Sequence, residues 1–357
     1  MNSLERKEIR YKRRKEKRNN INSNRYNVYN AFTFSNVLYY ADKCCLNVGW
    51  KRSTTLFKLH KFSIVGKVCT DIKNNTYKVG KTYRFQIKER GKVRDIDAPF
   101  IKDRLIHKVI SNEILIPLYD RHLIYNNGAS QEGKGFMFTL YRLKYILSKF
   151  YNKYKDGYVV LIDFSKFFEN CSHEIIHNIH KKYISDDYTI KVIEDYLFIV
   201  KGIALGLEIA QREAIILPNL LDHYIENNTG NIVRYMDDTI FLCKTKDEAI
   251  MLLNNYKKLA NKLNIKINDN KTKIIKLSNK FRYCKWNYII DRNNKIIMIP
   301  YRKTIYRQRR KIRKMYKLYL NNKIDYKEIE TIKKCFCAYL DMGNTNKYIK
   351  YLKRNYL

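Results

Sequence analysis

Two short β-prone runs joined by four residues constrain the fold of this chain more than any other feature. The runs are Asn231–Arg234 and Thr239–Cys243, and Tyr235–Asp238 (Tyr-Met-Asp-Asp) lies between them. Such runs joined across a polar pair predict a hairpin. Its turn would present two adjacent carboxylates, which repel each other and are costly to bury without a cation. Magnesium suits the pair, because it takes hard oxygen ligands and bridges carboxylates to substrate phosphates. An ordinary Asp-Asp turn is the alternative for the dipeptide alone.

A carboxylate upstream favours the metal interpretation. Asp163 follows the five-residue apolar run Tyr158–Ile162, which is typical of a strand buried on both faces. If this strand neighbours the hairpin, three carboxylates can hold two metal ions roughly 4 Å apart, the arrangement that promotes phosphoryl transfer. The alternative for Asp163 is a helix cap after a strand. The conjunction with Asp237 and Asp238 favours a two-magnesium site.

These motifs, in this order, resemble the reverse transcriptases from about Tyr77 to the C-terminus. Their style is that of bacterial members such as the enzymes of retrons and diversity-generating retroelements. The resemblance implies an α+β fold with fingers, palm and thumb, in which an antiparallel palm sheet is backed by helices. It also implies that Asp163, Asp237 and Asp238 are catalytic and hold two Mg2+ ions. The implied partners are an RNA template and a DNA primer or product.

The resemblance extends to residues that would bind the nucleotide. Phe168 stands where the family excludes a 2′-hydroxyl, which favours DNA over RNA synthesis; a core aromatic is the alternative. The segment Gly202–Gln211 resembles the template and nucleotide loop, where Gly206 would permit close backbone approach, although Leu205 replaces a polar residue of retroviral enzymes. The implied nucleotide-binding residues are Lys92, Arg94, Phe168, Gly206, Gln211, Tyr235 and Lys271.

Three further segments match the family's fingers, leaving-group and primer-grip motifs. Cations near Lys92 and Arg94 would neutralise a triphosphate, and Arg suits bidentate phosphate contacts. Lys271 stands where the family lysine approaches the pyrophosphate. Phe281–Trp286 stands where the primer-grip hairpin is expected, without its usual Leu-Gly. A solvated surface position is the alternative for each cation.

Two motifs point to other chemistries. His173-Glu174-Ile175-Ile176-His177 matches the zinc-protease pattern, but Ser172 is typical of a helix N-cap and no third-ligand motif follows. Gly128–Gly135 is close to a phosphate-binding loop, yet Gly135 replaces the hydroxyl residue that should hold magnesium. We interpret it as a fingers loop with Lys134 on phosphate, and a plain solvated loop is the alternative.

The charge of the chain predicts a polyanionic partner. Lys and Arg number 72 against 34 Asp and Glu, a net charge of +38. Residues 302–317 hold nine of these cations and no acid, with Ile305, Ile312, Met315 and Tyr319 as an apolar face. After a palm, this pattern favours a thumb helix along a duplex over a solvated or membrane-surface helix. The predicted nucleic-acid contacts are Lys134, Arg302, Arg307, Arg309, Arg310 and Arg313.

Local patterns predict several elements around these motifs. Tyr83–Ile87 and Lys92–Ile96 indicate a hairpin, and apolar spacing from Phe136 to Phe150 indicates a helix. Thr245 and Glu248 form a capping box before another helix. Residues 32–68 are expected to be helical and then irregular. The expected domains are a basic N-terminal region (1–75), fingers and palm (76–285), and the primer-grip end with the thumb (286–357).

The eight cysteines include no C-x-x-C pair, which predicts reduced thiols in the cytoplasm. No signal peptide or transmembrane run is visible, so no membrane partner is expected. The basic tract Arg6–Arg18 is expected to bind RNA. The expected function is primer extension with dNTPs on an RNA template, within a bacterial or phage retroelement. The alternatives are an antiphage-defence reverse transcriptase, acting with a noncoding RNA or without a template, and a non-catalytic RNA-binding protein. A noncoding RNA or accessory protein is a further expected partner.

Overall fold

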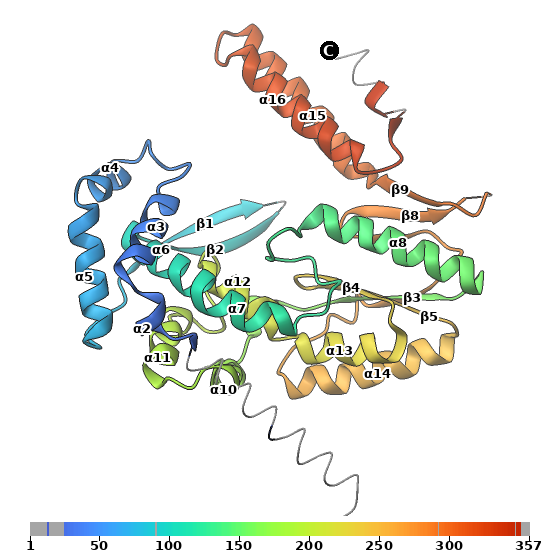
Figure 1. Cartoon of the computed structure of the whole chain (residues 1–357). Coiled ribbons are helices and arrows are strands. Elements are labelled where there is room, and N and C mark those ends of the chain that lie inside the picture. The colour runs from blue at the N-terminus through green and yellow to red at the C-terminus, as the bar shows by residue number, and fades with distance from the viewer. Residues whose placement is uncertain (1–12, 14–24, 90, 292, 347, 351–357) are drawn as a thin grey trace, which may run out of the picture. The chain divides into compact units, whose positions relative to one another are not determined.

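A computed structural model describes residue 13 and residues 25–89, 91–291, 293–346 and 348–350 (Figure 1). The chain divides into two compact units, and neither is continuous in sequence. One contains Met1–Tyr125, Phe164–His223 and Lys257–Lys266; the other contains Asn126–Asp163, Tyr224–Tyr256 and Ile267–Leu357. Apart from Arg13, the basic tract Arg6–Arg18 lies outside the described residues. The three consecutive domains expected from the sequence stay a prediction.

A four-stranded antiparallel sheet organises the second unit. Its order is β4-β5-β3-β6, formed by Ile232–Tyr235, Asp238–Cys243, Tyr158–Asp163 and Lys273–Lys276. The apolar run therefore forms a central strand, and β4 and β5 are the two arms of the expected hairpin. Both predictions are confirmed, and the fold is the mixed α+β fold expected for the family.

Helices cover both faces of this sheet (Figure 1). On one face, α8 (Phe136–Tyr154) packs Leu140, Leu143 and Leu147 in one cluster with Val159 and Ile240 of the sheet. The expected helical spacing is therefore confirmed. On the other side runs α14 (Lys246–Lys262), which begins where the Glu248 amide donates to Thr245 Oγ1 at 3.1 Å. The Glu248 carboxylate in turn accepts from the Lys244 amide at 2.8 Å, so the predicted helix start is confirmed.

A second antiparallel sheet of the same unit continues the core beneath α8. It consists of β7 (Phe281–Tyr283), β8 (Trp286–Ile290) and β9 (Ile296–Pro300), and it contributes buried Trp286, Tyr288 and Met298. The hairpin expected over 281–286 is therefore present.

Two helices follow the second sheet, α15 (Arg302–Leu320) and α16 (Tyr326–Asp341). They enclose a small core around Ile312, Phe336 and Leu340. The expectation for Tyr319 was wrong: this residue is exposed and its ring lies edge-on against Tyr326 at the start of α16, whereas Tyr316 packs against the core between the helices.

The first unit combines one hairpin with helices. The hairpin is β1 (Thr82–Glu89) paired with β2 (Lys92–Pro99), which confirms its prediction. The irregular stretch expected before residue 68 was wrong, because Phe57, Val65 and Val68 form buried faces of two helices. The helical elements of this unit are α2 (Val28–Ala31), α3 (Phe34–Cys44), α4 (Arg52–Leu59), α5 (Lys61–Lys73), α6 (Ile101–Val109), η1 (Ile110–Leu115), α7 (Ile116–Tyr119), η2 (Asp120–His122), α9 (Phe167–Asn170), α10 (His173–Tyr183), α11 (Asp187–Leu197) and α12 (Glu208–Ile216). The helix α13 (Asn219–Thr229) runs from this unit into the second.

Within the described part of the chain, no helix has the length and apolar character needed to cross a membrane. The eight cysteines are free thiols.

Candidate active site

Two of the candidate catalytic carboxylates lie opposite each other in the four-stranded sheet of the second unit. Asp163, the last residue of β3, pairs with Asp238, the first residue of β5. Because side chains alternate along a strand, both lie on the face that carries Leu161 and Ile240, the face covered by α8. Asp237 occupies the turn immediately before Asp238. The fold therefore brings together the three aspartates that the sequence singled out.

The turn that carries Asp237 is braced by a buried arginine. Arg234 is fully buried on β4, and its guanidinium donates to the Met236 carbonyl at 3.0 Å. Met236 has a φ of 54°, a left-handed conformation that is unfavourable for a non-glycine residue. The Gly128 amide donates to the Arg234 carbonyl at 3.0 Å, which joins the Gly128–Gly135 loop to the same strand. Strained backbone of this kind persists only where its surroundings hold it, and it gathers at functional sites.

The charge in the cluster calls for a cation. Burial, together with repulsion from Asp237 and Asp163, raises the pKa of Asp238 to about 7, while Lys271 and Lys285 oppose that rise. Three acidic oxygen donors on adjacent strand ends have the ligand chemistry that Mg2+ prefers. The residues therefore fit a divalent ion by donor type. As they stand, the described side chains contain no group of three or more acidic, His or Cys residues close enough to enclose one.

Lys271 provides the nearest positive charge. Its ammonium donates to both carboxylate oxygens of Asp163, at 3.0 and 2.8 Å. The Asn268 amide donates to the Asp163 carbonyl at 2.8 Å, and the Lys271 amide donates to the Asn268 carbonyl at 3.1 Å. The backbone of this turn therefore fixes Lys271 against the end of β3. The lysine assigned to the leaving group thus contacts a candidate metal ligand.

The β7–β8 turn adds groups that sequence reasoning did not assign to the carboxylates. The Tyr283 hydroxyl donates to the Asp238 carbonyl at 3.0 Å, and Cys284 Sγ lies 4.0 Å from Asp238 Oδ2. Burial, with the Asp238 charge, holds the pKa of Cys284 well above its usual value, so the thiol is a donor. Cys284 and Lys285 have φ values of 47° and 67°, as a tight hairpin turn requires. In the sequence, the only sign of this turn was its place in the segment 281–286, where the family normally has Leu-Gly.

Two of the candidate nucleotide positions of the first unit, Arg94 and Gly206, meet at its hairpin. Arg94 pairs with Ile87 across the hairpin, and two residues later Ile96 lies on the same face. The Asp97 amide donates to the Leu205 carbonyl at 2.8 Å, which attaches the Gly206 loop to β2. Lys92 is the first residue of this strand. The structure therefore brings the Gly206 loop against the strand that carries Arg94.

The close approach at Gly206 has a different reason from the one expected. Its φ is +109°, and a Cβ there would lie 2.7 Å from the Asp97 carbonyl oxygen. A packing contact with β2 therefore already requires glycine.

The remaining nucleotide candidates lie on three different elements. Phe168 is half-buried on α9 and stacks edge-on against Phe167, with ring centroids 5.6 Å apart. Gln211 is exposed on α12 of the same unit. In the second unit, the ring of Tyr235 packs edge-on against Phe136 at 5.7 Å.

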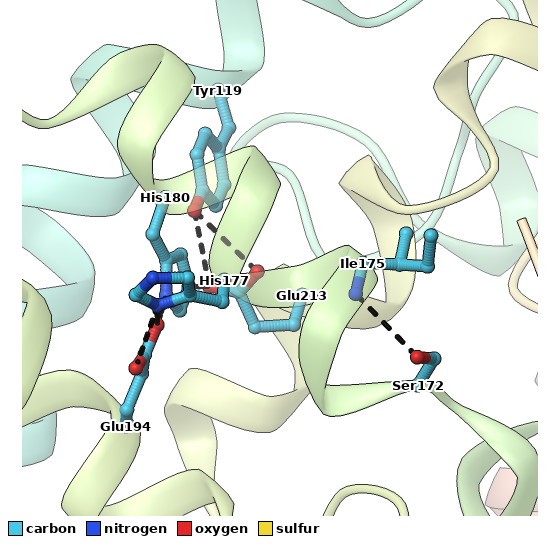
Figure 2. A network of polar contacts seen from close by, with 7 residues as sticks. All are labelled: Tyr119, Ser172, Ile175, His177, His180, Glu194 and Glu213. Atoms are coloured by element: carbon cyan, nitrogen blue, oxygen red, sulfur yellow. Dashed lines mark hydrogen bonds and ion pairs between the residues drawn. The ribbon is translucent and has the colours of Figure 1, made fainter.

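The zinc-protease pattern is part of a buried ionic network instead. His173 Nε2 bonds to the Gly202 carbonyl at 2.6 Å, whereas His177 Nδ1 lies 2.9 Å from the Glu194 carboxylate. Ser172 caps α10 as predicted, accepting from the Ile175 amide. Figure 2 shows the centre of the network, where His180 lies between Glu194 at 2.7 Å and Glu213 at 3.2 Å. The two histidines of the pattern, His173 and His177, face different partners, so they do not converge on one ion.

The predicted nucleic-acid contacts lie on a loop and on one helix. Lys134, in the Gly128–Gly135 loop, donates to Gln131 at 2.8 Å and lies over the Phe138 ring of α8. Arg302 begins α15 and donates to the Tyr306 hydroxyl at 2.9 Å. The exposed cations of α15 include Arg307, Arg310 and Arg313, whereas Arg309 is half-buried. These exposed arginines give α15 several positive charges.

Comparison with known families gives one match. A family model described as "Reverse transcriptase (RNA-dependent DNA polymerase)" matches residues 81–288, more than half of the chain. That span contains β1 to β7 and the start of β8, and with them the three aspartates. A sequence comparison with curated proteins gives no match.

Comparison with solved structures finds telomerases. A telomerase from Candida albicans, solved with a fragment of telomeric RNA, is 11% identical over 74% of this chain and 55% of its own, with a TM-score of 0.47. A truncated apo telomerase from Candida tropicalis is 14% identical over 62% of this chain and 55% of its own, with a TM-score of 0.45. The chain thus spans about half the length of these telomerases.

Proposed function

The chain belongs to the reverse transcriptase family, whose activity is RNA-directed DNA synthesis, and on that premise we propose that it extends a DNA primer with dNTPs on an RNA template. The observation that carries the proposal is the register pair Asp163–Asp238 with Asp237 in the adjoining turn. The family generally uses divalent metal ions and binds a nucleic-acid template and primer. We further propose that the chain uses two Mg2+ ions, held by these three aspartates.

The bound ions would activate the primer 3′-hydroxyl and stabilise charge on the phosphates. The residues of the chain would position the substrates, because phosphoryl transfer depends mainly on placement and electrostatics. In the first unit, Lys92, Arg94, Gly206 and Gln211 would bind the nucleotide, and Phe168 would exclude a 2′-hydroxyl. In the second, Tyr235 and Lys271 would contact it, with Lys271 directed to the pyrophosphate.

Cations of the second unit would hold the nucleic acid. Lys134 and the arginines of α15 present charge to phosphates, and such contacts release counterions. The arginines are Arg302, Arg307, Arg309, Arg310 and Arg313. Binding through them should weaken steeply with salt and depend little on sequence.

The biological setting is part of the proposal. We place the enzyme in the cytoplasm, in a bacterial or phage retroelement, with its template RNA and a noncoding RNA or accessory protein as partners. The absence of C-x-x-C pairs supports a reducing compartment, and the charge of +38 supports an RNA partner.

The test is primer extension on a defined RNA template with magnesium, comparing dNTPs with NTPs in wild type and Asp237→Asn. We expect DNA synthesis by wild type and none by the variant, which should still bind primer-template. Asp247→Asn is the matched control, because Asp247 is exposed at the start of α14 in the same unit. Synthesis by Asp237→Asn would refute the metal assignment. Synthesis without template would favour the defence role, and no synthesis by folded wild type would favour a non-catalytic RNA-binding protein.

A further inference from the structure

A lysine bound to a candidate metal ligand has a consequence for metal binding. The ammonium of Lys271 donates to both oxygens of Asp163, so a cation can approach that carboxylate fully only if the lysine moves. Asp163 is largely buried, with 18% of its side chain exposed, whereas that of Lys271 is 54% exposed. The Lys271 side chain can therefore swing away into solvent, whereas the Asp163 side chain is held in place.

The turn before β6 makes this contact a built feature. β6 pairs with β3 as far as Lys273 opposite Leu161, and Lys271 lies two residues earlier, in the turn. The Asn268 amide of the same turn donates to the Asp163 carbonyl at 2.8 Å. The turn formed by Asn268 and Thr272, closed by a 2.9 Å backbone bond, fixes this position.

We propose that Lys271 is a placeholder cation, which occupies Asp163 in the metal-free enzyme and moves to the nucleotide phosphates when a metal–nucleotide complex binds. This inference rests on the proposed function and adds an order of events to it. Free Mg2+ must compete with the lysine for Asp163. Mg2+ that arrives with a triphosphate brings the lysine a new anionic partner, so its displacement costs less.

Metal binding and nucleotide binding should be thermodynamically linked through Lys271. If Lys271 opposes free metal and favours metal–nucleotide, then nucleotide must increase the affinity for metal, and metal that for nucleotide, by the same factor. Without Lys271, the affinity for free metal should rise and this coupling should shrink. Removing a residue that merely supports the site would instead lower the affinity for free metal.

The test measures Mn2+ binding to the full chain by electron paramagnetic resonance, without primer or template, so that no synthesis can occur. The variants are Lys271→Gln, Lys271→Arg and Lys273→Gln. Lys273 is the matched control because it is an exposed lysine two residues away that lies opposite Leu161 instead of an aspartate. Asp163→Asn defines the binding that belongs to the site.

We expect Lys271→Gln to bind Mn2+ about two- to fivefold more tightly than wild type, the range for releasing a partly exposed ion pair. A dNTP should then increase its Mn2+ affinity by a smaller factor than in wild type. Lys271→Arg should stay near wild type, because arginine also binds a carboxylate. Lys273→Gln should match wild type as well.

Lys271→Gln that binds no more Mn2+ than wild type, or no more than Lys273→Gln, would overturn the proposal. The result does not depend on polymerase activity. Synthesis surviving in Asp237→Asn would refute the proposed function by itself, so the two failures can be told apart.

Discussion

The His180 network in the first unit leads to a prediction about folding stability and pH. His180 is fully buried between Glu194 and Glu213, and the Tyr119 hydroxyl donates to Glu213 at 3.2 Å (Figure 2). Burial lowers the pKa of the imidazole, but the attraction of Glu213 and Glu194 outweighs it and raises the pKa from 6.5 to about 9. The network therefore holds a buried imidazolium that links α7, α10, α11 and α12.

The magnitude follows from this difference. A shift from 6.5 to about 9 corresponds to about 3 kcal/mol of unfolding free energy. The folded-state pKa is raised, so the contribution is fully present below pH 6.5 and is lost as the pH rises through about 9. Replacing His180 by Gln removes the cation and leaves Glu213 buried without a positive partner, which costs roughly 3–5 kcal/mol at neutral pH.

The assay is urea unfolding followed by far-ultraviolet circular dichroism across this pH range. The difference between wild type and His180→Gln should be largest at pH 6.5 and should shrink by about 3 kcal/mol towards pH 9. His107→Gln is the matched control. His107 is also fully buried, but burial lowers its pKa to about 4 despite Asp103, so it stays neutral over this range.

The expected control result is a stability difference between wild type and His107→Gln that does not vary over the same pH range. A His180→Gln difference that stays constant as well would refute the reasoning, because it would mean that His180 is neutral in the folded protein.

Three further predictions concern backbone and buried polar groups, each checked by urea unfolding. Gly206→Ala should lower the free energy of unfolding by about 2 kcal/mol more than Gly91→Ala does, because both glycines have positive φ but only Gly206 would place a Cβ against the Asp97 carbonyl. Equal losses of stability in the two variants would contradict this. Lys285→Gly should stabilise the chain by up to about 1 kcal/mol by relieving a left-handed residue, and a loss would contradict it. Asp103→Asn should cost about 2–3 kcal/mol, because Asp103 Oδ1 accepts from Tyr77, Tyr196 and Gly80; a change below about 0.5 kcal/mol would contradict it.

Elements with a strong local pattern could be predicted from the sequence. The β4–β5 hairpin and the end of β3 followed from apolar runs and turn residues, and these placed Asp163, Asp237 and Asp238 together. The apolar period of α8 and the cap of α14 were equally local. The catalytic and binding roles assigned to the site residues from the sequence stay predictions.

Features that depend on distant contacts could not be predicted. The left-handed Cys284-Lys285 turn and its approach to Asp238 depend on how two sheets pack, which no local period encodes. His173 and His177 match a metal pattern locally, but their partners, the Gly202 carbonyl and Glu194, come from distant segments that the pattern does not contain. The prediction for Tyr319 was wrong because packing against α16 decides which residues of α15 are buried.

The position of β3 has a consequence for how the protein folds. It is the first strand of its sheet to leave the ribosome, yet both its edges pair with strands made much later, and Asp163 meets Lys271 across 108 residues. Until then a strongly apolar strand has two open edges, which are templates for aggregation. Contacts of such long sequence separation also slow folding. The carboxylate cluster should therefore form late and in a single step, and the newly made chain should need chaperones more than a helical protein of equal length.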